Sequence, residues 1–275
     1  MELALGTAQF GMTYGVTNTN RRMSLRSQRR IIDVAKAYGI SKLDTAAGYG
    51  ESENNLGLLG VDEFKVSTKI PFIKNNEGGE VARYLEASLK RLKASRLDVI
   101  YLHDEKNIGR QDIMMELEEL KRAGKVERIG VSIYAKTNVS FDLSSFDVVQ
   151  CQGNAIDRAF EELLRSGPSI FLRSVFLQGL LLADIDKIPR FLRSETPLFE
   201  SWERYCRNLG HSKLDMCLYH SIAAGVDVVV VGCSSADELE EIASSFERMK
   251  HTADIPYFRV TNPNEFLIDP RRWPK

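Results

Sequence analysis

The sequence predicts a single (β/α)8 barrel, and three observations support this. The chain has 275 residues, close to the roughly 250 of a typical barrel of this kind. Short runs rich in Val, Ile and Leu alternate with longer amphipathic segments, which is the pattern of β-α units that build a parallel sheet. No Pro/Gly/Ser-rich linker divides the chain, so we expect one domain over residues 1–275. An open doubly wound sheet is the alternative, but it lacks its G-x-G-x-x-G fingerprint here.

Each predicted strand is a short apolar run that closes on a polar residue or a glycine. In chain order the runs are Leu3–Thr7, Lys42–Thr45, Lys65–Lys69, Asp98–His103, Arg128–Ser132, Val148–Gln152, Ile170–Ser174 and Val228–Gly232. The carboxyl ends of the strands of a parallel barrel meet on one face, where the active sites of such barrels lie. The residues that close the strands are therefore the first candidates for a site.

The helical patterns fall between these strands. They are Leu25–Tyr38, Ser52–Leu59, Glu80–Leu92, Asp112–Ala123, a poor one near Thr137–Ser144, Phe160–Arg165, Leu198–Leu209, Lys213–Ala223 and Asp237–Lys250. Ser24 and Gly39 have the residue types of a helix start and stop, and Gly124 ends a later helix. Ser52 and Glu53 are expected to cap the helix that they open.

Two longer segments stand outside the regular alternation. The connection from Val175 to Asp227 carries two helical patterns, and extra length after a barrel strand usually builds a pocket wall. From about residue 251 the chain contains several prolines, so we expect an irregular tail.

Composition excludes several classes of function. The net charge of −1 gives no electrostatic footprint for nucleic acid or an anionic membrane surface. No apolar run approaches the roughly 20 residues of a membrane helix, and no signal-peptide pattern opens the chain, so we expect a cytoplasmic protein with a small-molecule partner. The cysteines form no C-x-x-C pair and the histidines have no ligand spacing, so we expect reduced thiols and no metal site. The sequence carries no signal for an oligomeric state.

Four polar residues near successive strand ends suit the reduction of a carbonyl group. Tyr49 carries a phenol whose ordinary pKa, near 10, makes it a reluctant acid until a nearby ammonium favours the phenolate. Lys69 could supply that charge and Asp44 could hold the lysine in place. His103 could orient the substrate oxygen by a hydrogen bond. Since no side chain supplies a hydride, a nicotinamide cofactor is implied.

The same residues carry a family resemblance. The segments L-D-T-A-A-G-Y-G-E-S-E-N-N-L-G, K-V-S-T-K-I, D-V-I-Y-L-H and R-I-G-V-S occur in this order and resemble the aldo-keto reductase superfamily, in the manner of a bacterial member, over about Leu3 to Phe246. The resemblance implies a (β/α)8 barrel that binds NADP(H) in an extended pose without a Rossmann domain. It also implies that the Asp-Tyr-Lys-His tetrad of the family falls on Asp44, Tyr49, Lys69 and His103, with Tyr49 as the proton donor.

The resemblance also assigns cofactor contacts. Ser132 and Gln150 match residues that hold the nicotinamide carboxamide, and Asn154 matches a site-facing asparagine. The other candidate cofactor-binding residues stand at the strand ends and in the turns that follow them: Gly6, Thr7, Ala8, Asp44, Arg173, Ser174, Gln178, Gly232, Cys233, Ser234, Ser235 and Glu238.

Three positions depart from the pattern of the family. Ile133 replaces an asparagine that shares the carboxamide, and Arg173 replaces a Tyr or Trp that stacks on the nicotinamide. Its positive charge disfavours the oxidised, cationic ring and so favours reduction. Glu238 stands near the place where relatives grip the 2′-phosphate with Lys or Arg, although a carboxylate suits a free ribose hydroxyl better. NADP(H) is the expected cofactor, and NAD(H) is not excluded.

The sequence therefore predicts an NADPH-dependent reductase of an aldehyde or ketone. The polar residues near the expected mouth, including Arg173, Gln178 and Arg193, suggest a sugar-derived carbonyl compound. The main alternative is a regulatory or low-turnover barrel protein that binds the cofactor, and a metal-dependent barrel hydrolase or isomerase is a third, weaker reading. Neither the substrate nor the physiological direction follows from these motifs.

Overall fold

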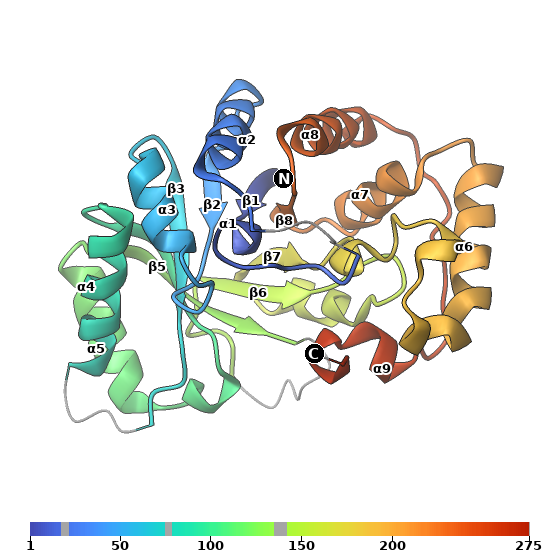
Figure 1. The fold of residues 1–275 in the computed structure, drawn as a ribbon. Coiled ribbons are helices and arrows are strands. Elements are labelled where there is room, and N and C mark those ends of the chain that lie inside the picture. The colour runs from blue at the N-terminus through green and yellow to red at the C-terminus, as the bar shows by residue number, and fades with distance from the viewer. Residues whose placement is uncertain (18–21, 75–78, 135–141, 275) are drawn as a thin grey trace.

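The computed structural model describes residues 1–17, 22–74, 79–134 and 142–274. Its centre is a closed barrel of eight parallel strands in chain order (Figure 1). The strands are β1 (Glu2–Gly6), β2 (Lys42–Asp44), β3 (Lys65–Ile70), β4 (Leu97–Leu102), β5 (Val126–Ile133), β6 (Val148–Gln152), β7 (Ser169–Arg173) and β8 (Val228–Gly232). The pairing of β1 with β8, from Glu2 opposite Val228 to Gly6 opposite Gly232, closes the sheet. The predicted (β/α)8 barrel is confirmed, and the open sheet is excluded.

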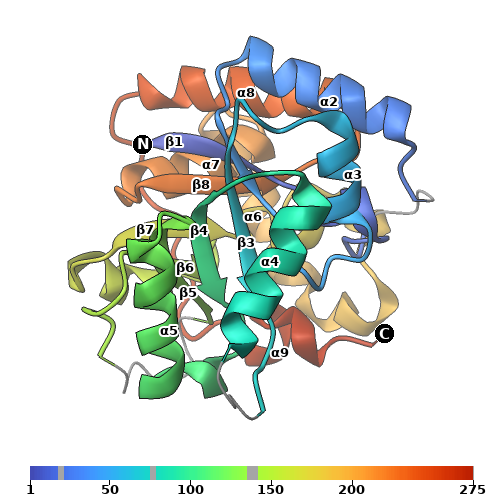
Figure 2. The same cartoon turned by 90° about the vertical axis from the view of Figure 1, so that its left-hand side faces the viewer.

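The helices form the outer layer of the barrel or lie over its ends. The α-helices are α1 (Ala8–Gly11), α2 (Leu25–Ala37), α3 (Ser52–Leu59), α4 (Glu80–Leu92), α5 (Gln111–Arg122), α6 (Thr196–Asn208), α7 (Lys213–Ala223), α8 (Ala236–Lys250) and α9 (Glu265–Ile268). The 3-10 helices are η1 (Glu105–Asn107), η2 (Ala159–Arg165), η3 (Leu177–Gly179), η4 (Ile185–Lys187), η5 (Arg190–Glu195) and η6 (Pro270–Arg272). Helices α2 and α8 lie side by side on the outside of the barrel (Figure 2).

The helix predictions differ from the structure in two places. The pattern at Phe160–Arg165 forms the 3-10 helix η2, which has seven residues. Most of the predicted helix near Thr137–Ser144 lies outside the described residues, and residues 142–144 are not helical. The tail lacks regular structure from residue 252 to 264 and then forms α9 and η6.

The expected N-terminal cap is confirmed at α2 and wrong at α3. The Ser24 hydroxyl accepts a hydrogen bond from the Ser27 N–H at 3.1 Å, as a cap of α2 should. Neither Ser52 nor Glu53 caps α3, because both side chains turn inward and are buried. Ser52 Oγ donates to the Thr7 carbonyl at 2.8 Å. These contacts tie α3, and with it the preceding loop, to the barrel.

A plug of side chains closes the barrel beneath the strand ends. The Tyr101 ring belongs to a buried group made of Ala4, Val99, Tyr101, Val148, Phe171, Val228 and Val230. Gly130 makes room for this ring, because a Cβ there would lie 2.6 Å from a ring carbon. Lys69 Nζ lies 5.7 Å from the centroid of the same ring. This buried group therefore packs against the polar residues at the strand ends through the contact between Tyr101 and Lys69.

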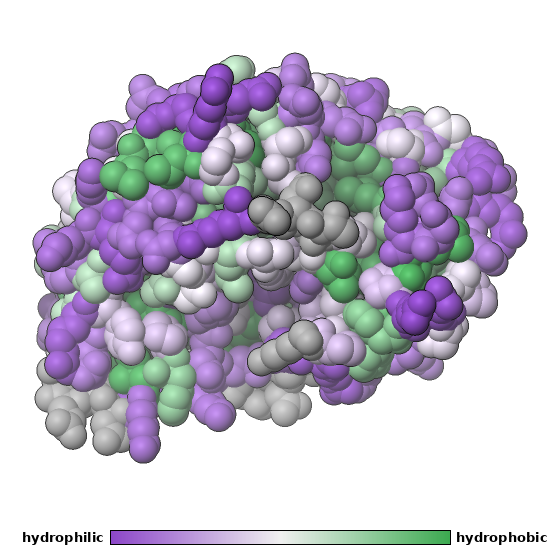
Figure 3. Space-filling view, viewed as in Figure 1, coloured by the Kyte–Doolittle hydropathy of each residue, from purple (hydrophilic) through white to green (hydrophobic). Residues whose placement is uncertain are grey.

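The outer surface gives little sign of a large apolar interface on the face that Figure 3 shows. This face is mostly hydrophilic, and its apolar residues form small separate groups. Within the described residues, no helix has both the length and the apolar character needed to cross a bilayer.

Candidate active site

An ion pair between neighbouring strands forms the base of the site. Asp44 ends β2, and Lys69 lies near the end of β3. Lys69 Nζ donates to Asp44 Oδ2 at 2.6 Å and to the Thr45 carbonyl at 2.8 Å. Both side chains are almost fully buried, so the pair is held with little freedom to move.

Tyr49 and His103 complete a group of four above this pair. Tyr49 lies in the loop between β2 and α3, and His103 directly follows β4. Lys69 Nζ lies 5.1 Å from the centroid of the Tyr49 ring. The rings of Tyr49 and His103 meet edge to face, with 6.3 Å between their centroids. The structure thus brings the four predicted catalytic residues together.

The pKa of Tyr49 differs in direction from the expectation. Burial of the phenol and the nearby charge of Asp44 raise its pKa above the ordinary value. Lys69 does not reverse this, because its ammonium is hydrogen-bonded to Asp44 and Thr45 and lies over the ring. Tyr49 is therefore a neutral phenol at physiological pH, which is the form that donates a proton.

His103 is neutral as well. Burial within the barrel mouth and the charges of Lys69 and Arg173 lower its pKa to about 4. By surface area the residue is exposed, because its outer side faces the open mouth, so solvent screens part of this effect. A neutral imidazole carries one N–H, and it can donate that N–H to a substrate oxygen.

The predicted carboxamide residues form a buried chain that ends on Asp44. Ser132 Oγ donates to Gln150 Oε1 at 3.1 Å, and Gln150 Nε2 donates to Asp44 Oδ1 at 2.7 Å. Asn154 stands apart, because its amide oxygen accepts hydrogen bonds from the backbone N–H groups of Ile156 and Asp157. It holds the turn after β6 in shape.

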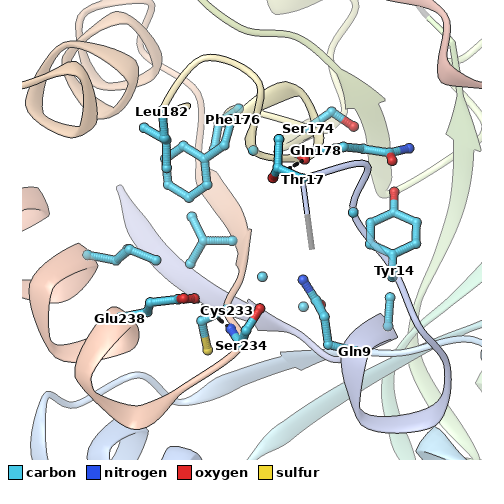
Figure 4. Close-up of a pocket in the computed structure, with 18 of the residues that line it drawn as sticks. Gln9, Tyr14, Thr17, Ser174, Phe176, Gln178, Leu182, Cys233, Ser234 and Glu238 are labelled. Atoms are coloured by element: carbon cyan, nitrogen blue, oxygen red, sulfur yellow. Dashed lines mark hydrogen bonds between the residues drawn. The ribbon is translucent and has the colours of Figure 1, made fainter. Parts of the chain in front are cut away.

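A cavity of about 440 Å³ opens beside Tyr49 and extends to the start of α8 (Figure 4). The predicted residues that line it are Gly6, Thr7, Ala8, Asp44, Tyr49, Arg173, Ser174, Gln178, Gly232, Cys233, Ser234 and Glu238. The predicted residues outside its lining are Lys69, His103, Ser132, Gln150, Asn154 and Ser235.

Sequence reasoning missed part of the cavity wall. The missed residues include Tyr14, Thr17, Phe176, Leu182, Asp184, Lys187, Leu214 and Glu241. Tyr14 and Thr17 follow the four-residue helix α1, which is too short to show a helical period. Glu241 could have been predicted from the sequence, because it stands three residues after Glu238 and so lies on the same face of α8.

The loop after β7 crosses one side of this cavity in an unusual backbone conformation. Ser174, Leu177 and Gln178 all have positive φ angles, of 64°, 47° and 54°, which non-glycine residues seldom adopt. Thr17 Oγ1 donates to the Gln178 carbonyl at 3.2 Å and so joins this loop to the segment after α1. Both side chains appear beside the cavity in Figure 4.

Arg173 lines the cavity without a carboxylate partner in the described part of the chain. Its guanidinium donates to the Ile133 carbonyl at 3.2 Å and to Ser174 Oγ at 3.3 Å. The guanidinium carbon lies 4.5 Å from the centroid of the Tyr134 ring. Its positive charge therefore remains available to the cavity.

Comparison with known proteins identifies the family of the chain. A model of the Aldo/keto reductase family matches residues 2–259. D-arabinose 1-dehydrogenase from Saccharomyces cerevisiae is 25% identical over 256 residues, which cover 80% of this chain and 76% of that protein. Aflatoxin B1 aldehyde reductase member 2 from Rattus norvegicus is 31% identical over 141 residues, which cover 47% of this chain and 38% of the relative.

A solved structure supports the same fold. The holo form of an aldo-keto reductase from Bacillus halodurans matches with a TM-score of 0.70 and 23% identity, over 90% of this chain and 86% of that one. The family match covers nearly the whole barrel, including every residue of the group around Tyr49. The chain therefore belongs to the aldo/keto reductase family, whose members are oxidoreductases that use a nicotinamide cofactor on small-molecule carbonyl compounds.

Proposed function

We propose that this protein reduces an aldehyde or ketone to an alcohol, with Tyr49 as the proton donor. The observation that carries the proposal is the position of Tyr49, which lines the cavity next to the buried pair of Asp44 and Lys69. The raised pKa of the phenol fits this role. A carbonyl oxygen that gains a hydride on its carbon must gain a proton. A positioned phenol can supply that proton.

The cavity suits the nicotinamide dinucleotide that the family uses. Its volume of about 440 Å³ lies within the range of small-molecule and cofactor sites. Gly232, at the end of β8, leaves room for the Gln9 side chain, because a Cβ at this position would lie 2.8 Å from the Gln9 amide. Ser132 and Gln150 are proposed to hold the carboxamide, which would require Gln150 to share or release its bond to Asp44. When bound, the cofactor supplies the hydride.

The protein residues then divide the remaining work. Tyr49 holds the proton and gives it to the substrate oxygen. His103 donates a second hydrogen bond to that oxygen and keeps it in line with the phenol. Lys69 places a positive charge near the phenolate that remains after proton transfer, and Asp44 keeps the lysine in position.

The substrate is proposed to be a polar carbonyl compound, such as a sugar derivative. Arg173 and Gln178 line the cavity and offer hydrogen-bond donors. Arg193 takes no part, because it is exposed on η5 and outside the cavity lining. A panel of sugar-derived and apolar aromatic aldehydes tests this choice, and a clear preference for the aromatic group would reverse it.

The mechanism is tested by the variant Tyr49→Phe. It removes the acid with little change in shape, so we expect kcat for carbonyl reduction to fall by about 100-fold or more, as for a lost general acid. Tyr38→Phe is a suitable control, because Tyr38 is an exposed residue at the end of α2. The rates are measured by cofactor absorbance across the same carbonyl panel.

Two outcomes separate the proposal from its alternative. Reduction by Tyr49→Phe at the rate of the unchanged protein would refute the role of the phenol. Cofactor binding without oxidation by any carbonyl compound in the panel would instead favour a regulatory or low-turnover protein.

A further inference from the structure

The two sides of the cavity carry opposite charge. On the reacting side, Asp44 and Lys69 form a pair, and Arg173 adds one positive charge. The side at the start of α8 is lined by Glu238 and Glu241. Figure 4 shows Glu238 on the side away from Tyr14, and Tyr14 lies near enough to Tyr49 for Tyr49 to raise its pKa.

The Glu238 carboxylate occupies the first turn of α8. Its Oε2 accepts a hydrogen bond from the Ser234 N–H at 2.7 Å, while its own N–H donates to Ser235 Oγ at 3.1 Å. Free N–H groups and the positive end of a helix dipole would otherwise attract a phosphate to this place. Here the Glu238 carboxylate already accepts a hydrogen bond from one of these groups, the Ser234 N–H.

Within the described lining, Arg173 is the cation without a carboxylate partner, and it lies on the reacting side of the cavity. Lys213 lies outside the lining, and its Nζ donates to the Ala183 carbonyl at 2.6 Å. Lys187 is the basic residue of the β7–α6 connection that lines the cavity, and its Nζ donates to Asp184 Oδ2 at 2.7 Å. Asp184 lines the cavity as well, so this pair adds no net charge. The side with Glu238 is left acidic.

We infer that this side binds an adenosine ribose with a free 2′-hydroxyl, so that the protein prefers NAD(H) to NADP(H) and Glu238 is the residue that sets the preference. This inference rests on the proposed function, because it requires the nicotinamide at Tyr49 and hence the adenosine at the other side of the cavity. It reverses the order of preference that the sequence suggested.

The physical reason is the charge of the extra phosphate. A phosphate monoester carries about −1.5 to −2 charges at neutral pH, and beside Glu238 it would meet a like charge at the position where it needs a donor. A carboxylate is a good acceptor for the ribose hydroxyls. The two cofactors therefore differ in affinity through one identifiable side chain.

The test measures binding directly. NADH and NADPH are titrated into the protein and followed by nicotinamide fluorescence and calorimetry, without a carbonyl substrate. We expect NADH to bind at least tenfold more tightly than NADPH. The variant Glu238→Gln should reduce that ratio about tenfold, and Glu238→Arg should reverse it.

Two controls test whether a change in the affinity ratio is specific to the charge of Glu238. Gln at position 238 can still accept from the Ser234 N–H, so the helix start is preserved, and thermal unfolding checks this. The second control is Glu240→Gln, which removes a carboxylate from the same helix. Glu240 lies outside the cavity lining, and its Oε1 accepts a hydrogen bond from the Tyr38 hydroxyl at 3.2 Å. We expect the ratio to be unchanged by Glu240→Gln.

The outcomes distinguish this inference from the proposed function. Tighter binding of NADPH by the unchanged protein, or an unaltered ratio in Glu238→Gln, would overturn the inference alone. Binding of NADH without turnover would overturn the reductase proposal and leave the cofactor preference standing. Binding of neither cofactor would overturn both.

Discussion

At the scale of single residues, the site shows how burial decides between two opposing effects on a phenol. A nearby ammonium should lower the pKa of Tyr49, and burial should raise it. Lys69 is held by Asp44 and the Thr45 carbonyl, so its charge is already balanced. Burial prevails and the phenol keeps its proton, which suits an acid in reduction better than a base in oxidation.

This argument predicts a simple pH profile. Tyr49 stays protonated at alkaline pH because its pKa is raised, and His103, with a pKa of about 4, is neutral above about pH 5. We expect kcat/KM for reduction to be flat from about pH 5.5 to 9 and to fall at lower pH, where His103 gains a proton. Oxidation of the alcohol requires Tyr49 without its proton, so its rate should rise with pH over the same range.

Steady-state rates in both directions, at saturating cofactor, check this profile. A reductive rate that declines between pH 7 and 8 would show that Tyr49 loses its proton there, which is incompatible with a raised pKa.

At the scale of elements, the loop that carries Tyr49 is positioned by α1. Gly11, the last residue of α1, packs directly on this loop. A Cβ at Gly11 would lie 1.7 Å from the Tyr49 carbonyl oxygen and 2.4 Å from the Ser52 nitrogen. Both contacts are with backbone, which has little room to yield. The closeness of α1 to the loop therefore sets where the phenol stands.

The variant Gly11→Ala tests this packing. The added methyl group should displace the Tyr49 loop, lower kcat strongly and reduce the free energy of unfolding by about 3 kcal/mol, as overpacking does. Gly48→Ala is the matched control in the same loop, because a Cβ at Gly48 meets nothing within 4 Å. Urea unfolding and turnover are measured for both variants. Equal behaviour of the two would contradict the role of α1.

At the scale of the whole molecule, the tail after α8 is attached to the outer helices through a histidine. His220 on α7 is buried, and its Nε2 accepts a hydrogen bond from the Phe258 N–H at 3.1 Å. Burial and the charge of Arg158 lower its pKa from 6.5 to about 3. In the folded protein His220 therefore stays neutral, whereas in the unfolded chain it binds a proton below about pH 6.5.

The sign of the resulting pH dependence follows. His220 favours the folded state fully above pH 6.5, and this contribution is lost as the pH falls towards 3, by at most about 1.4 kcal/mol per pH unit. The variant His220→Gln should be less stable at pH 7 but should lose less stability between pH 6 and 4. Urea unfolding at several pH values measures the slope. An unchanged slope would mean that His220 does not titrate in this way.

The fold was readable from the sequence because its signals are local and repeated. The run Val228–Gly232 was predicted with the bounds that β8 has, and Lys213–Ala223 with those of α7. The family match, confirmed over residues 2–259, rests on motifs at the strand ends. Short elements such as α1 and η3 escaped, because three or four residues show no period.

The details of the site depended on contacts between distant residues. The inward turn of Ser52 depends on Thr7, 45 residues earlier in the chain. The bond from Gln150 to Asp44 joins residues 106 positions apart. Neither pairing has a signature in local composition. The pKa of Tyr49 likewise depends on how deeply the finished barrel buries the phenol.

The hydrogen-bonded chain from Ser132 through Gln150 and Asp44 to Lys69 has a consequence for how variants are read. It joins β5, β6, β2 and β3, so it braces the mouth of the barrel and also sets the chemistry there. Loss of the Asp44 carboxylate would leave the Gln150 Nε2 group without this acceptor and the buried Lys69 ammonium with only the Thr45 carbonyl. Loss of activity in an Asp44 variant could therefore result from lost contacts between strands as well as from a missing catalytic group. Tyr49 takes no part in these hydrogen bonds, so its replacement leaves the contacts between the strands intact.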